Sequence, residues 1–382
     1  LQIQALYQWD GLLLPQLSMD QACCGGPRST RRHGDLPMKI THVGVDIAKS
    51  VFHIHGVDRH GQVQWRGKYP RHKWLDAIEE RVPKHAVVGM EACASSHYWA
   101  RQLQARGYYA KLIAAQFVKP YVKSNKNDRL DAEAICEALG RPNMRFVTVK
   151  TAQQQDTQAA HRIREELVSR RTAKANQIRG LAGEYGLSAP VGIQKLKQLL
   201  PQWLEDAENG LSDDFRILLA DLADDLRYLD ERIRKVTNQI QQGAQKDPTA
   251  KRLMTLRGVG PITASALAGA LGDGTSFGKG RDFAASLGLT PRQHSTGTGG
   301  RERLLGISKR GDSYLRKLLV HGARAVIRHA KNRDDSLTRW VNGLSTRKHL
   351  NAVVVALANK TARLAWALTY YRQSYNPELS AG

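Results

Sequence analysis

Two aspartates three residues apart are the residues in this sequence best suited to acid chemistry. They are Asp128 and Asp131, within the stretch Asn125–Glu133, and they fall at the start of a predicted helix over Asp128–Leu139. This spacing puts both carboxylates on one helix face, with Cβ atoms about 5–6 Å apart. Two such acids repel each other unless a cation lies between them. The pair also suits an ordinary solvated helix N-terminus, where the helix dipole favours acids.

Two further carboxylates lie in predicted strands. Asp46 interrupts the apolar run Val43-Gly-Val-Asp-Ile, where an unpaired charge is costly, and Glu91 ends the run Ala86-Val-Val-Gly-Met. If these strands are sheet neighbours, the two acids face each other at one end, and the helix brings its aspartates over them. Oxygen ligands without a histidine cluster select Mg²⁺ or Mn²⁺ over zinc. Two such ions about 4 Å apart would activate a nucleophile and stabilise the leaving oxygen at a phosphodiester.

Each of these acids also has a purely structural interpretation. Asp46 suits a capped strand end or one paired with Lys49, and Glu91 suits an exposed strand terminus. The metal site is favoured because all four acids fall where one shared site needs them.

The elements that would position the acids form an α/β domain with a mixed sheet, predicted over residues 38–150. Short strands joined by turns are typical of antiparallel hairpins, and alternating helices and strands follow them. The predicted strands are Thr41–Lys49, Val51–Val57, Gln62–Tyr69, Ala86–Glu91 and Tyr108–Ala114, and the helices are His72–Arg81 and His97–Arg106, the second capped by Ser95 or Ser96.

The composition indicates a nucleic-acid-binding protein of a reducing cytosol. The 382 residues carry a net charge of +23, with the excess predicted to run along the whole chain. Such a charge suits a polyanion, because each phosphate contact releases counterions. Four cysteines, Cys23, Cys24, Cys93 and Cys136, show neither zinc-site spacing nor a disulfide framework, which fits a reducing compartment. No apolar run reaches the ~18 residues of a membrane span.

Residues 1–37 differ from the rest and are expected to be a non-native or disordered leader. They show little periodicity and begin with leucine, whereas Met38 directly precedes a strand pattern. The apolar segment Gly11–Leu17 has no basic residue before it and is too short for a signal peptide.

Residues 151–249 are predicted to be helical and to join protomers through a coiled coil. A heptad-like seam of about three repeats supports this; its members are Leu218, Leu222, Leu226, Leu229, Ile233, Val236 and Ile240. The alternative is a helix packed within the same chain, with Gln153–Ala182 as its antiparallel partner. Pro190 and Pro201 are predicted to break the region between the two helices.

Residues 250–375 are predicted to be a helical, basic domain, with a tail at 376–382. Gly258 and Gly260 permit the tight turn of a helix–hairpin–helix, whose following helix can bind a phosphate through backbone N–H groups. The stretch Ser286–Arg316 is predicted to be a basic loop, and two helices, Ser313–His329 and Asn351–Tyr371, close the chain. The candidate nucleic-acid contacts are Lys126, Arg129, Gly258, Gly260, Thr263, Arg292, Arg301, Arg303, Lys309, Arg310 and Arg316.

Six motifs occur in the order found in one known family. The first three are Val43-Gly-Val-Asp-Ile-Ala-Lys, Gly89-Met-Glu-Ala and Lys126-Asn-Asp-Arg-Leu-Asp-Ala. The others are Gly258-Val-Gly-Pro-Ile-Thr-Ala, Leu287-Gly-Leu-Thr-Pro-Arg-Gln-His-Ser-Thr-Gly and Gly306-Ile-Ser-Lys-Arg-Gly-Asp-Ser-Tyr-Leu-Arg. From about Met38 to Tyr371 the sequence thus resembles the DEDD transposases, the insertion-sequence family numbered one hundred and ten, and its subgroup numbered eleven-eleven.

The resemblance implies an RNase H-like first domain, similar to the RuvC Holliday-junction resolvase, and a C-terminal transposase domain. It also implies that Mg²⁺ or Mn²⁺ is bound by Asp46, Glu91, Asp128 and Asp131. A serine of the C-terminal domain is the family's DNA nucleophile, and the motif places it at Ser295. Thr296 and Ser286 remain alternatives, because the glycine-rich stretch after Ser295 is slightly longer than the family pattern.

The resemblance further implies an RNA-guided bridge recombinase, in which an element-encoded RNA pairs with donor and target DNA while the protein reads backbone and shape. Dimers or tetramers would let one subunit's acids meet another's Ser295. For a transposase of a bacterial insertion sequence the resemblance implies the bacterial cytoplasm, in association with the nucleoid. Two other functions compete with a transposase that cuts and exchanges DNA strands. One is a RuvC-like junction resolvase that uses water as its nucleophile, and the other is a non-catalytic nucleic-acid scaffold.

Overall fold

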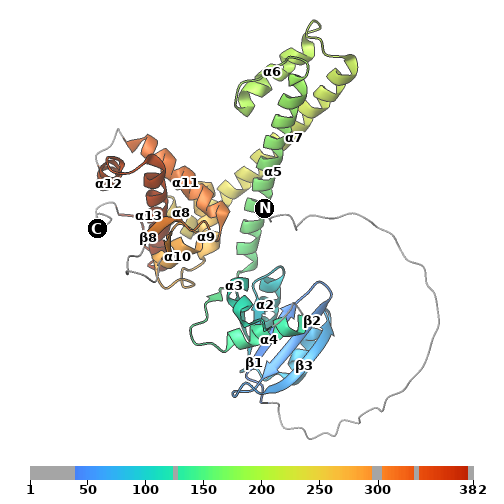
Figure 1. Cartoon of the computed structure of the whole chain (residues 1–382), viewed down its shortest axis with the longest axis vertical. Helices are drawn as coiled ribbons and strands as arrows, with labels where there is room; N and C mark the ends of the chain where they lie inside the picture. The colour runs from blue at the N-terminus through green and yellow to red at the C-terminus, as the bar shows by residue number, and fades with distance from the viewer. Residues whose placement is uncertain (1–38, 124–127, 295–302, 331–334, 377–382) are drawn as a thin grey trace, which may run out of the picture. The chain divides into compact units, whose positions relative to one another are not determined.

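The computed structural model describes residues 39–123, 128–294, 303–330 and 335–376 (Figure 1). The predicted leader lies outside the described residues. Residues from Lys39 onward form one compact unit.

A six-stranded mixed sheet forms the centre of the N-terminal α/β domain. Its order is β3-β2-β1-β4-β5-β6, in which β1 pairs with β2 and β2 with β3 antiparallel, whereas β1, β4 and β5 are parallel. The strands are β1 His42–Ile47, β2 Val51–Val57, β3 Val63–Pro70, β4 Val87–Glu91, β5 Tyr109–Ile113 and β6 Phe146–Val147. The predicted mixed sheet is confirmed, with the short strand β6 added.

An aromatic core covers one face of the sheet, beneath α1 (Trp74–Arg81) and α2 (Ser96–Ala105). Phe52 of β2 lies 5.2 Å from Trp74 and 5.4 Å from Trp99 between ring centroids, and all three are buried. The predicted cap of α2 is wrong in its chemistry, because Ser95 occupies the N-cap position with φ 66° and makes no side-chain cap bond.

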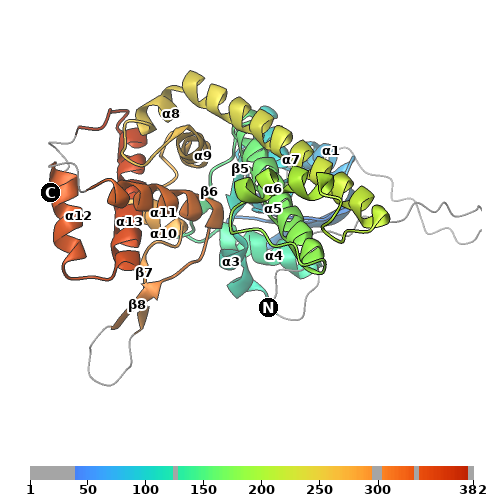
Figure 2. The same cartoon turned by 90° about the horizontal axis from the view of Figure 1, so that it is seen from above.

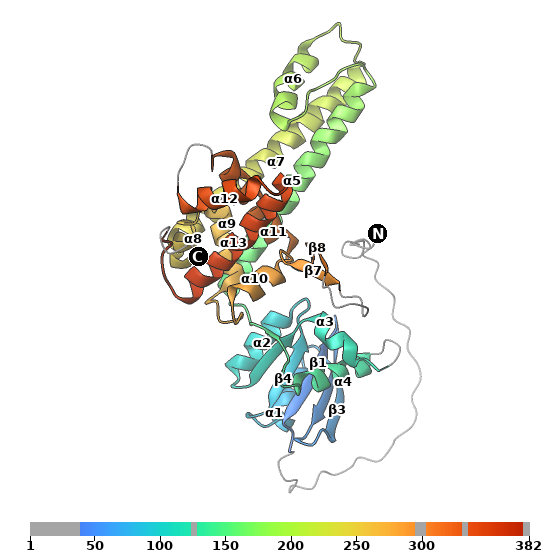
Figure 3. The ribbon, with the colours of Figure 1, turned by 60° about the vertical axis from the view of Figure 1, so that its left-hand side comes forward.

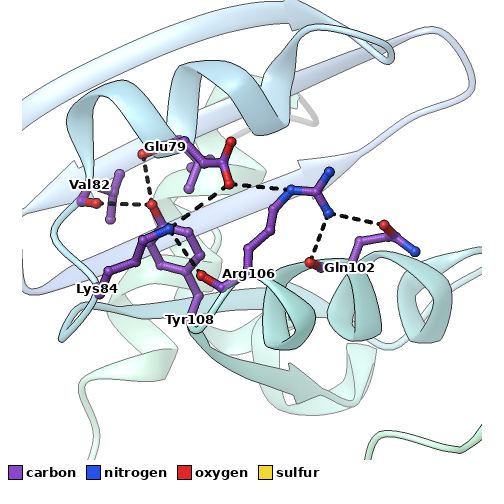
Figure 4. A network of polar contacts seen from close by, with 7 residues as sticks. Glu79, Val82, Lys84, Gln102, Arg106 and Tyr108 are labelled. Atoms are coloured by element: carbon purple, nitrogen blue, oxygen red, sulfur yellow. Dashed lines mark hydrogen bonds and ion pairs between the residues drawn. The ribbon is translucent and has the colours of Figure 1, made fainter.

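Polar contacts tie the end of α1 to the end of α2 and to the residue before β5 (Figure 4). The buried Tyr108 hydroxyl donates to the carbonyl oxygens of Val82, at 3.1 Å, and Ile78, at 3.3 Å. Arg106 Nε lies 3.4 Å from Glu79 Oε1. These contacts join the end of α1 to the start of β5.

The opposite face is covered by α4 (Asp128–Leu139), which begins and ends at the predicted residues. Figure 3 shows α4 lying across the sheet over β1. The second half of α4 packs Ile135 and Leu139 against Ile113 of β5 and Val118 of α3 (Ala115–Val118), which a short 3-10 helix, Lys119–Tyr121, follows.

Two long helices, α5 (Ala152–Gly183) and α7 (Asp213–Lys246), run side by side and antiparallel (Figures 1 and 3). Arg164 bonds Thr237, Arg171 bonds Asp230 and Lys174 pairs with Asp225, so rising numbers on α5 meet falling numbers on α7. The predicted seam packs within the chain: Leu226, Ile233 and Ile240 are buried where α7 runs against α5. Of the two predicted arrangements, the structure shows the intramolecular one.

The predicted seam also starts one residue too early. Leu218 is 57% exposed, whereas Leu219 is fully buried with Leu226. The predicted break at Pro201 is wrong, because Pro201 lies inside α6 (Ile193–Glu205), whose buried residues Leu200 and Trp203 hold the helix together across the missing N–H.

The positive charge is not spread along the whole chain, contrary to expectation. Between residues 213 and 231, α7 carries seven acids against two arginines. One of the acids, Asp230, accepts from Arg171 at 2.9 Å and Lys197 at 2.8 Å. Burial raises the pKa of Asp230, but these two bonds and the two positive charges outweigh it, so the pKa is lowered.

The C-terminal helical region has more elements than predicted. They are α8 Pro248–Leu253, α9 Pro261–Leu271, α10 Gly280–Ser286, β7 Pro291–His294, β8 Arg303–Ile307, α11 Ser313–Arg328, α12 Ser336–Ser345 and α13 Leu350–Tyr370. Three helices rather than two close the chain, and a β-hairpin lies within the predicted basic loop. Figure 2 shows this β7–β8 hairpin extending from the helices beside it. All of β7 is exposed, so no apolar alternation marked it as a strand.

A buried histidine joins α5 to the C-terminal helices. His161 of α5 is 3% exposed, with Nδ1 3.0 Å from the Tyr314 hydroxyl of α11 and Nε2 3.2 Å from the Ser265 hydroxyl of α9. Burial, with a smaller contribution from the charge of Arg164, lowers the pKa of His161 to about 4. The folded protein therefore holds a neutral imidazole there.

This histidine is expected to make the folded state sensitive to acid. A depressed histidine pKa gives stability that is complete above the unfolded pKa of 6.5 and is lost as pH falls towards about 4. The loss amounts to about 3 kcal/mol. Urea unfolding of His161→Gln between pH 7 and 4 should show a flatter pH profile than the wild type, whereas His321→Gln, at an exposed histidine of α11, should keep the wild-type slope. Equal slopes for all three proteins would refute the assignment. The pKa of His97 is also lowered to about 4, so the difference between profiles is the relevant quantity.

Candidate active site

Asp46 and Glu91 lie at the carboxyl ends of two adjacent parallel strands. Val45 of β1 pairs with Met90 of β4, so the next residues along, Asp46 and Glu91, are level with each other. Both residues are half-buried. The predicted neighbouring of these strands is thus confirmed.

Both acids also belong to the sheet face that α4 covers. A Cβ added to Gly44 would lie 2.5 Å from the backbone nitrogen of Cys136 in α4, and one added to Gly89 would lie 3.0 Å from Leu139. Because strand residues two apart share a face, Asp46 and Glu91 point to the same side as these glycines.

The middle of α4 rests on β1. The Cys136 thiol is 3.7 Å from the His42 carbonyl oxygen, and a Cβ added to Gly44 would meet the Ala132 carbonyl oxygen. Asp128 is the first residue of α4, one turn before Ala132. Asp131 is half-buried beside Ala132.

The negative charges of the two strand acids affect the pKa of the nearby Cys93 thiol. Cys93 follows β4 by two residues and is exposed, although its sulfur is partly desolvated. Desolvation is the largest cause that raises the pKa of Cys93, and the charges of Glu91 and Asp46 raise it further. Sequence reasoning treated this cysteine only as a clue to the redox compartment.

The donor chemistry of this end of the sheet fits a hard divalent cation, because it gathers carboxylate oxygens. Among the side chains that the structure describes, which exclude that of Asp128, no group of three or more His, Cys, Asp or Glu residues has the arrangement of a metal site. The four-acid ligand set thus stays a prediction.

The predicted nucleophile lies outside the described residues. Ser295 and Thr296 follow β7 directly, within the undescribed segment 295–302. Ser286 is described at the end of α10, where its hydroxyl donates to the Phe283 carbonyl oxygen at 2.7 Å.

Three predicted nucleic-acid contacts are exposed basic side chains in and around the β7–β8 hairpin: Arg292, Lys309 and Arg310. Arg129, on α4, is exposed too, and Arg303 begins β8. Arg316 has a structural role, because its Nη1 donates to the Leu287 carbonyl oxygen at 2.7 Å. Lys126 and Arg301 lie outside the described residues.

The predicted helix–hairpin–helix turn joins α8 to α9, and its residues also serve internal packing. Gly258 has φ 79°, and a Cβ there would lie 2.7 Å from the Gly322 carbonyl oxygen of α11. Gly260 is the N-cap of α9, and Thr263 is only 8% exposed. The predicted phosphate contact through the backbone N–H groups at this helix start stays a prediction.

Most of the chain is similar to known transposases. The model of the transposase family IS116/IS110/IS902 matches residues 250–338, and a model of the DEDD transposases matches residues 43–186. A probable family 20 transposase of Pseudomonas aeruginosa is 49% identical over 89% of this chain and 100% of its own length. This chain belongs to the IS110-type DEDD transposases.

Two transposases of named insertion sequences are also similar to this chain. The transposase of insertion sequence IS1328 of Yersinia enterocolitica is 44% identical over 86% of this chain and 97% of its own length. That of IS1111A of Coxiella burnetii is 42% identical over 90% and 93%. The α/β domain of the transposase is RNase H-like, and domains of this type use divalent metal ions. No helix in the described parts of the transposase is long and apolar enough to cross a membrane.

Proposed function

We propose that this transposase cuts and exchanges DNA strands with Mg²⁺ or Mn²⁺ held by Asp46, Glu91, Asp128 and Asp131, and with Ser295 as the nucleophile. The observation that supports the metal site most directly is the register of β1 and β4, which puts Asp46 and Glu91 level with each other on the sheet face that α4 covers. A bound divalent ion would supply stabilisation of negative charge at the phosphodiester.

The chain's own residues would perform the remaining steps. The four carboxylates would hold the divalent ion, and the basic side chains of the chain would help to orient the scissile phosphate relative to the serine hydroxyl. The serine oxygen would bond to phosphorus as its proton leaves, and the displaced strand oxygen would depart and take up a proton. The resulting phosphoserine ester would be attacked by a hydroxyl of the incoming strand, which restores the serine.

The other parts of the proposal concern partners and organisation. An element-encoded guide RNA is consistent with the net charge of +23 and with the exposed Arg292, Lys309 and Arg310. We place domain boundaries near residues 150 and 249, at the starts of α5 and α8. Strand exchange needs at least two active sites, so we propose a dimer or tetramer. Because the seam of α7 packs against α5 of the same chain, protomers would meet through other surfaces.

The test is an exchange assay on double-stranded DNA with purified protein, its element-derived RNA and Mg²⁺. Ser295→Ala and Asp128→Ala should both abolish exchange while RNA and DNA binding persist, and only the wild type should leave a covalent protein–DNA adduct. Full cleavage by Ser295→Ala, with loss in Asp128→Ala, would instead show a nuclease that uses water. Exchange unchanged in Asp128→Ala would remove the metal site from the proposal.

A further inference from the structure

A network of charged side chains anchors the first turns of α4. Glu133 Oε1 lies 3.2 Å from Lys123 Nζ, and Glu133 Oε2 lies 3.6 Å from Arg66 Nη2 of β3. Glu137, one turn further along α4, lies 3.5 Å from the same Lys123. Lys123 is the last described residue before α4, so these pairs join the helix to the chain that enters it.

Beneath this network lies a buried histidine of the sheet. His55 of β2 is 4% exposed, and Arg66 Nε lies 3.4 Å from its Nδ1. His55 pairs in register with Gly44, the residue on which α4 rests.

The two halves of α4 are held by different interactions. Its second half is held by apolar contacts of Ile135 and Leu139 in a buried cluster. Its first turn carries Asp128 and Asp131. In the proposed metal site these two acids would lie close to Asp46 and Glu91, and like charges repel when no cation lies between them. An attachment of the first turns must therefore oppose this repulsion in the metal-free protein.

We infer that Glu133 is a positioning residue of the transposase: by pairing with Lys123 and Arg66 it holds the start of α4, and with it Asp128 and Asp131, over β1. The inference rests on the proposed metal site for its effect on catalysis, but not for its effect on α4. The pairs are partly exposed, with side-chain exposures of 42% for Arg66 and 64% for Lys123, so each adds little to global stability. The effect is local.

The test compares Glu133→Gln with Glu79→Gln in the full chain. Glu79 of α1 is a matched control, because it too faces two cations, Arg106 at 3.4 Å and Lys84 at 4.0 Å, on the opposite face of the sheet. In metal-free, DNA-free protein, backbone amides of residues 129–135 should exchange hydrogen faster in Glu133→Gln only, while the thermal midpoint stays near that of the wild type.

The second readout is the Mg²⁺ dependence of DNA cleavage. Glu133→Gln should cleave about tenfold more slowly at low Mg²⁺ and recover as Mg²⁺ rises, because a misplaced pair of acids costs rate. Glu133→Asp should recover part of the loss. Unchanged amide exchange in Glu133→Gln would overturn the inference whatever the cleavage rate. A wild type that does not need a divalent ion would overturn the proposed function instead, and leave the exchange result to decide on Glu133.

Discussion

Replacing Gly44 with alanine is expected to abolish DNA cleavage and to lower the free energy of unfolding by about 3 kcal/mol. The added Cβ would lie 2.5 Å from the backbone nitrogen and 2.8 Å from the Cβ of Cys136, and closer still to the Ala132 carbonyl oxygen. These atoms belong to the body of α4 and cannot rotate away. The helix must therefore move off β1, which would take Asp128 and Asp131 out of the proposed metal site.

Gly56→Ala is the matched control for this prediction, since Gly56 is a buried strand glycine whose added Cβ would meet Ile40 at an ordinary 3.4 Å. Chemical denaturation and a DNA cleavage assay should separate the two variants. Cleavage at the wild-type rate by Gly44→Ala would mean that α4 does not rest on β1 in the active protein.

Asp46→Asn is expected to slow strand cleavage about a thousandfold, which corresponds to about 4 kcal/mol of transition-state stabilisation. The amide keeps the size of the side chain but removes a charge that a divalent ion needs. In metal-free protein the thermal midpoint should stay the same or rise, because the level carboxylate of Glu91 loses a like-charged neighbour. Loss of activity without loss of stability distinguishes a functional acid from a structural one.

Cys93 offers an independent measurement for the same variant. Asp46 helps to raise the pKa of this exposed thiol, so Asp46→Asn should lower that pKa and speed alkylation of Cys93 at a given pH below it. Mass spectrometry of the Cys93 peptide reports the rate separately from the buried Cys136. Adding Mg²⁺ to the wild type should act in the same direction. Asp76→Asn, on the exposed side of α1, should leave the rate unchanged; an Asp46→Asn rate equal to it would place Asp46 away from Cys93.

Local sequence patterns were sufficient to predict the elements in which apolar residues recur with the period of a strand or a helix. The bounds of β2 and α4 agree with prediction because alternating and helical apolar spacings filled those stretches. They failed where burial depended on distant partners. The exposed strand β7 carried no apolar pattern, and Pro201 remained in a helix because Leu200 and Trp203 pack against other helices. The helix α12 was missed although Leu337, Val341 and Leu344 recur at helical spacing.

The sequence by itself determined the family, the mixed α/β domain and the identity of four candidate acids, because these depend on residue types and their order along the chain. Only the tertiary structure decided that Val45 pairs with Met90, that Gly44 admits the backbone of α4, and that the seam of α7 packs on α5. Each of these is a contact between segments distant in sequence. Such contacts are selected by shape and burial across the whole fold, and no local spacing encodes them.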